Sequence, residues 1–174
     1  MQKVVKLTIL FAFIFSFGCK KNDTTPTPPK IIFLEAHISS DNSYSSVNFE
    51  FFDADGDLGL KQEENTGNQE YNVFVDYFEK NNGVWELKSP IVDSTYNFDT
   101  MLWEYNTQYF HVRMPYIENE AKLSLEGDIK VLLFFNNFKF TQTAKADTFR
   151  YDISIKDRAL HLSNVITTSE LIMN

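Results

Sequence analysis

Residues 149–156 read FRYDISIK, and every second side chain in this stretch is large and apolar. Polar and charged residues fill the positions between them. Such an alternation predicts a β-strand with one buried and one exposed face. The apolar set is Phe149, Tyr151, Ile153 and Ile155. These four side chains are therefore expected to face the core.

The same alternation recurs along the chain and predicts about eight strands in all. Apolar and polar residues alternate around Phe49 and Phe51 and again from Tyr71 to Tyr77. Further strands are expected at residues 31–38, 84–88, 109–114, 129–135 and 164–171. A helical pattern is present only around residues 117–125. Because aromatic residues make up 16% of the chain, we predict an all-β sandwich.

Two connecting segments differ in how clearly the sequence predicts their structure. Residues 78–87, FEKNNGVWEL, predict a tight hairpin because Asn82 and Gly83 tolerate a positive φ angle. Trp85 in this hairpin is expected to face the core. Residues 89–108 predict either a long crossover or a surface loop.

Residues 131–140, VLLFFNNFKF, are interpreted as a central strand. The alternative interpretation is an edge strand that faces a partner.

The N-terminus has the pattern of an export signal. Lys3 and Lys6 precede an apolar stretch at residues 7–17, and the only cysteine, Cys19, follows at the expected cleavage point. Residues 1–18 are therefore predicted to be a signal peptide. The next residues, 19–30, are rich in proline, threonine and charge, which predicts a flexible tether.

Charge limits the choice of partners. Without the first 18 of its 174 residues, the chain has 156 residues, 14 of them basic and 24 acidic, so its net charge is −10. This acidity argues against nucleic acid and against an anionic membrane surface as direct partners. It is compatible with cations.

The four residues SFGC resemble the lipobox of bacterial lipoproteins, in which the cysteine, here Cys19, becomes lipidated. Lys20 follows where aspartate would signal retention in the inner membrane, so the resemblance implies the outer membrane, on its periplasmic or its outer side. Residues 151–168 resemble the closing hairpin of immunoglobulin-like envelope domains. Together these segments resemble a family of Bacteroidota envelope lipoproteins without assigned activity. The resemblance implies a single immunoglobulin-like β-sandwich of about 7–8 strands at residues 31–174.

Asp53, Asp55 and Asp57 alternate within FFDADGDLG at the end of a predicted strand. Alternate carboxylates in a turning loop are typical ligands of Ca²⁺. A helix-loop-helix calcium site would place its glutamate at Glu64, but Leu58 stands where that loop needs glycine. A looser calcium site stays open, with Asp157 and Asn164 as contributors from another loop. The alternative is that the aspartates form only a polar turn.

No catalytic motif is present. The sequence has neither a GxSxG nor an HExxH motif, and its three histidines lie far apart. We therefore expect a lipid-anchored protein that is not an enzyme and has a structural or adhesive role, with calcium as its one candidate cofactor. The alternative is a glycan- or peptide-binding module for nutrient capture, in which an exposed cluster of Trp103 and Tyr105 contacts the ligand.

Overall fold

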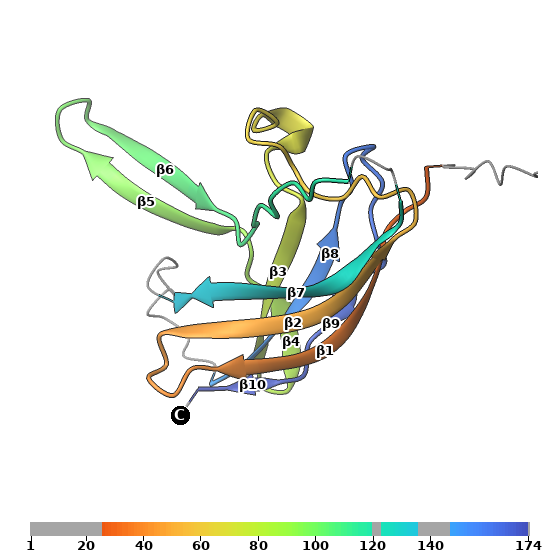
Figure 1. Ribbon diagram of the computed structural model, residues 1–174. Helices are drawn as coiled ribbons and strands as arrows, with labels where there is room; N and C mark the ends of the chain where they lie inside the picture. The colour runs from red at the N-terminus through yellow and green to blue at the C-terminus, as the bar shows by residue number, and fades with distance from the viewer. Residues whose placement is uncertain (1–25, 120–122, 136–146, 174) are drawn as a thin grey trace, which may run out of the picture.

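The structure is a computed structural model that describes residues 26–119, 123–135 and 147–173 (Figure 1). The predicted signal peptide, Cys19 and most of the predicted tether lie outside the described residues. None of the described segments is a helix with the length and apolar character needed to span a membrane.

The described residues form ten β-strands and one short 3₁₀ helix, η1 (Gly67–Gln69). The all-β prediction is therefore confirmed. The strands are β1 (Lys30–Ile38), β2 (Tyr44–Asp53), β3 (Val73–Asn81), β4 (Val84–Leu87), β5 (Ile91–Asn97), β6 (Leu102–Gln108), β7 (Leu125–Phe134), β8 (Thr148–Ile155), β9 (Ile166–Thr167) and β10 (Leu171–Ile172).

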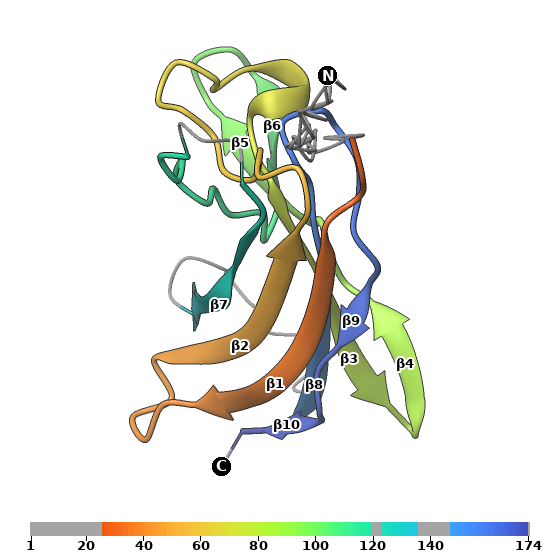
Figure 2. The same cartoon turned by 45° about the vertical axis from the view of Figure 1, so that its right-hand side comes forward.

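The strands form two larger antiparallel sheets and one separate hairpin. One sheet has the order β1-β2-β7, and the other has the order β10-β8-β3-β4, with β9 also paired to β8. These two sheets lie face to face (Figure 2), which is the sandwich arrangement that the sequence predicted. The remaining pair, β5 and β6, forms a two-stranded sheet of its own.

The core lies between the two sheets and is built from alternate residues of the strands. The four apolar residues of β8 are all buried, as their spacing predicted. The core residues that flank them on β3 and face them from β2 are Val73, Val75, Tyr77, Val47, Phe49 and Phe51. Because each strand presents one apolar and one polar face, the sheets can bury the apolar faces against each other.

One buried hydrogen bond joins the two sheets directly. The hydroxyl groups of Ser45 on β2 and Tyr151 on β8 lie 2.8 Å apart, and both residues have no exposed surface. Burial raises the pKa of Tyr151, so its hydroxyl group keeps its proton. A buried polar group needs a partner of this kind to offset its loss of water.

The predicted hairpin at residues 78–87 is confirmed, but one of its side chains points the other way. Asn82 and Gly83 have φ angles of 49° and 82° and join β3 to β4. Trp85 was predicted to face the core, and this was wrong. Its ring lies beneath the charged groups of Arg150, at 4.6 Å, and Lys80, at 5.3 Å, on the outer face of the sheet.

Several expected elements have a different place in the structure. Residues 131–134 of the segment interpreted as a central strand belong to β7, which in the described residues pairs with β2 alone and forms an edge of its sheet. Residues 136–140 of that segment lie outside the described residues. Residues 109–114 form a short bridge from Val112 to Val73 in place of a full strand. The described part of residues 117–125 contains no helix. Residues 89–108 were predicted to be either a crossover or a surface loop. In the structure they contain the hairpin β5–β6.

Tyr151→Phe should lower the free energy of unfolding by about 1–2 kcal/mol, because it leaves the buried hydroxyl group of Ser45 without a partner. Urea unfolding of the purified protein measures this loss. Adding Ser45→Ala removes the unpaired group, so the double variant should lose less than the sum of the two single losses. Strict additivity of the two losses would show that the hydroxyl groups do not interact.

Candidate metal centre and aromatic hairpin

The aspartate loop, residues 53–60, begins at the last residue of β2. Two glycines allow it to turn, since Gly56 and Gly59 have φ angles of 68° and 93°. Space also requires the first glycine, because a Cβ atom on Gly56 would lie 1.9 Å from the carbonyl oxygen of Leu123. The glycines therefore fix where the aspartates before and after them point.

Backbone and side-chain contacts hold the aspartate loop against the sandwich. The Oδ2 atom of Asp53 accepts a hydrogen bond of 2.8 Å from the amide of Leu58, whose side chain is fully buried. Two residues later, the amide of Leu60 donates to the carbonyl oxygen of Met114 at 3.0 Å. The loop is thus fastened at both ends, which favours one fixed arrangement of its carboxylates.

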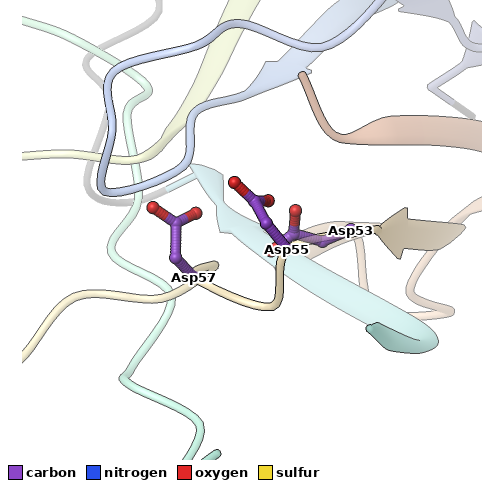
Figure 3. Close-up of side chains that lie close together, drawn as sticks. All are labelled: Asp53, Asp55 and Asp57. Carbon is purple, nitrogen blue, oxygen red and sulfur yellow. The ribbon is translucent and has the colours of Figure 1, made fainter. Parts of the chain in front are cut away.

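The three aspartates of this loop bring their carboxylates together. One oxygen from each of Asp53, Asp55 and Asp57 lies within 4.8 Å of the others. Figure 3 shows the three side chains side by side on the same stretch of loop. The Oδ1 atom of each aspartate is buried and has no hydrogen-bond partner. The grouping predicted from the alternation of these residues is therefore present.

This crowding changes the acidity of the carboxyl groups. Burial raises the pKa of Asp53 to about 7, and the neighbouring carboxyl group of Asp55 raises it further. Burial also raises the pKa of Asp57, and the nearby charges of Asp157 and Asp55 raise it further. In the absence of a cation, a proton on Asp53 relieves part of the repulsion between the carboxylates.

A second loop lies beside the aspartate loop. This C-terminal loop, residues 156–165, follows β8 and places the amide of Ala159 3.0 Å from the Oδ2 atom of Asp57. Asp157 is fully buried in the same loop and accepts a hydrogen bond of 2.7 Å from the amide of His161. The sequence did not decide whether the C-terminal loop lies beside the aspartate loop. In the structure the two loops are neighbours.

Two residues considered for the site are engaged elsewhere. Glu64 forms an ion pair of 2.6 Å with Arg158 and accepts a hydrogen bond from the amide of Lys61. The strand before the loop and this ion pair rule out the helix-loop-helix arrangement. Asn164 was also considered as a ligand, but its side chain bonds both the amide and the carbonyl group of Ile31 at 2.9 Å. It holds the start of β1 in place.

The hairpin β5–β6, called the aromatic hairpin here, extends away from the sandwich (Figure 1). Its base is fastened by Ile91 and by Phe110, which are buried in the core. Beyond this base its two strands pair, within the part of the chain that the structure describes, only with each other. Its tip residues Phe98 and Met101 are 83% and 75% exposed. The exposed apolar side chains of this hairpin therefore mark a candidate contact surface.

One face of the aromatic hairpin carries its aromatic rings. Tyr96 pairs with Trp103 and Ser94 with Tyr105 across the two strands, so their side chains share a face. The ring of Tyr96 contacts the rings of Phe98 and Trp103 edge to face, at 5.1 and 5.3 Å between centroids. Trp103 and Tyr105 remain 58% and 71% exposed. The sequence analysis gave an exposed cluster of Trp103 and Tyr105 as an alternative, and this cluster is present in the structure.

Sequence reasoning missed the hairpin itself, although a signal for it was available. Apolar and polar residues alternate from Trp103 to Asn106, just after the turn FDTM at 98–101. Asn97 closes this turn by accepting hydrogen bonds from the amides of Asp99 and Thr100. The alternation was obscured because serine, threonine and asparagine occupy both faces of the strands.

Comparison with protein-family models, with curated proteins and with solved structures found no match for this chain.

The pKa of Asp53 gives the metal-free protein a defined pH dependence. Its ordinary value is 3.8, and folding raises it to about 7, so the folded state binds the proton more tightly than the unfolded state. The contribution of Asp53 to stability is therefore complete below about pH 4 and is lost as the pH rises through 7.

In buffer with a chelator, Asp53→Asn should be more stable than the unchanged protein at pH 8, and the difference should shrink towards pH 5. Urea unfolding at each pH measures it. His111, whose pKa is lowered by burial, contributes with the opposite sign, but it is present in both proteins and cancels in the difference. A difference that does not depend on pH would contradict the prediction.

Proposed function

We propose that this protein is a lipid-anchored, non-enzymatic adhesive module of the cell envelope, whose aromatic hairpin binds a carbohydrate. The observation that carries this proposal is the exposure of Trp103 and Tyr105 on one face of a hairpin that stands away from the core. A purely structural role in the envelope would not require these rings to be exposed.

The chemistry of this face favours a neutral carbohydrate. The residues that alternation places on it are uncharged, and they comprise Val92, Ser94, Tyr96, Trp103, Tyr105 and Thr107. A sugar ring has an apolar C–H face and a border of hydroxyl groups, which suits flat aromatic rings beside serine and threonine hydroxyl groups. The acidity of the chain disfavours nucleic acid and other polyanions as ligands.

The anchor is the second part of the proposal. A diacylglycerol and an acyl chain on Cys19 would provide the two or more chains that stable membrane attachment requires. The tether at residues 19–30 would then hold the sandwich near the outer membrane while leaving the aromatic hairpin accessible.

The double variant Trp103→Ala, Tyr105→Ala should weaken carbohydrate binding by roughly 5- to 150-fold, because each aromatic contact is worth about 0.5–1.5 kcal/mol. Affinity electrophoresis in gels that contain xylan, mannan, laminarin or amylopectin measures the binding. The unchanged protein should be retarded by at least one of these polysaccharides.

Leu102→Ala is the matched control for this experiment. Leu102 is 64% exposed on the same strand, but its register with Asn97 places it on the opposite face of the hairpin. It should therefore bind like the unchanged protein. If no polysaccharide retards the unchanged protein, or if Leu102→Ala weakens binding as much as the double variant does, the carbohydrate-binding role is wrong.

Cys19→Ser should abolish membrane attachment in the cells that make the protein, because it removes the sulfur atom that carries the lipid. Mass spectrometry of the unchanged protein should find an N-terminus at residue 19 with the added mass of the lipid chains. Cell fractionation of the two forms then tests attachment directly. A mature unchanged protein without lipid mass, recovered in the soluble fraction, would contradict the anchor.

A further inference from the structure

The aspartate loop concentrates negative charge without a matching positive charge among the described residues around it. Asp53 has no exposed surface, and its Oδ1 atom is buried without a hydrogen-bond partner beside the carboxylates of Asp55 and Asp57. Arg158 is the cationic group that acts on Asp57, but its guanidinium group already binds Glu64 at 2.6 Å. A buried carboxylate oxygen without a hydrogen-bond donor is costly, and a bound proton or cation would remove that cost.

We propose that Asp53, Asp55 and Asp57 bind one Ca²⁺ ion, and that this ion fastens the aspartate loop to the C-terminal loop. The site would take a divalent cation with oxygen ligands. It is separate from the aromatic hairpin, so the inference does not depend on the carbohydrate-binding role.

The spacing of the oxygens fits the coordination shell of calcium. Calcium binds oxygens at about 2.3–2.6 Å, so two ligands of one ion can lie up to about 5 Å apart. The three aspartate oxygens lie within 4.8 Å of one another, so no pair of them exceeds this limit. Magnesium binds at about 2.0–2.1 Å in a rigid octahedron, which holds its ligands within about 4 Å and favours water. Water and backbone carbonyl groups would complete the calcium shell.

Asp57 connects the ion to the second loop. Its Oδ2 atom accepts the hydrogen bond from the amide of Ala159 at 3.0 Å, while its Oδ1 atom is buried without a partner. One carboxylate can therefore contact the ion and the C-terminal loop together. The charge of Asp157, which acts on Asp57 from that loop, would also be offset by the ion. Calcium should thus order both loops.

Thermal melts of the mature chain, residues 19–174 with Cys19→Ser, test the site after chelation and again with calcium. Calcium at about 100 times its Kd should raise Tm by roughly 5–10 °C, and titration calorimetry should give one ion per chain. Magnesium at the same concentration should have little effect. No rise in Tm with calcium would overturn the proposal.

Asp55→Asn is the informative variant because the Oδ1 atom of Asp55 makes no hydrogen bond that the substitution would break. It should fold and lose the calcium response. Asp99→Asn, at the exposed tip of the aromatic hairpin, makes the same change of charge away from the site and should keep the full response. An undiminished response in Asp55→Asn would overturn the assignment of ligands.

Hydrogen exchange tests the fastening of the two loops. Calcium should slow the exchange of the Ala159 amide at least tenfold in the unchanged protein and leave it unaltered in Asp55→Asn. Protection confined to residues 54–60 would overturn the link to the C-terminal loop. This readout distinguishes the proposed fastening from a general rise in stability, which would slow exchange throughout the core.

Discussion

The face-to-face packing of alternate apolar side chains from β2, β3 and β8 is the constraint on which the rest of the structure depends. Tyr151 is central to it, since its ring packs against Phe149 and Tyr77 while its hydroxyl group reaches Ser45 in the opposite sheet. This packing fixes the register of the strands, because a shift by one residue would turn every buried side chain outward. The positions at which the strands end are thereby fixed as well.

The geometry of the aspartate loop depends on this packing. Asp53 is the last residue of β2 and stays fully buried, so the chain leaves the sheet with a carboxylate pointing into the protein. The C-terminal loop leaves β8 next to it and places Asp157 close to Asp57. Acidic side chains therefore crowd at one end of the sandwich, where a cation or a proton must offset their charge.

The aromatic hairpin also depends on the core, although it extends away from it. Phe110, at the base of the hairpin, is buried and stacks on Tyr77 at 5.3 Å between ring centroids. A two-stranded hairpin is only marginally stable in water, so this anchor and the contacts of Tyr96 with Phe98 and Trp103 hold its shape. The rigid core can thus present an exposed aromatic face at a fixed position.

The sequence by itself determined the all-β class, the buried face of β8 and the turn at Asn82 and Gly83, because period-two alternation and positive φ angles are local properties. It also identified the three aspartates and the exposed rings as candidates. Only the tertiary structure decided that Asp157 lies near Asp57 and that Asn164 instead bonds Ile31. It likewise decided that β7 is an edge strand in the described sheet. These outcomes depend on which strands become neighbours, and that order follows from packing between residues far apart in the chain.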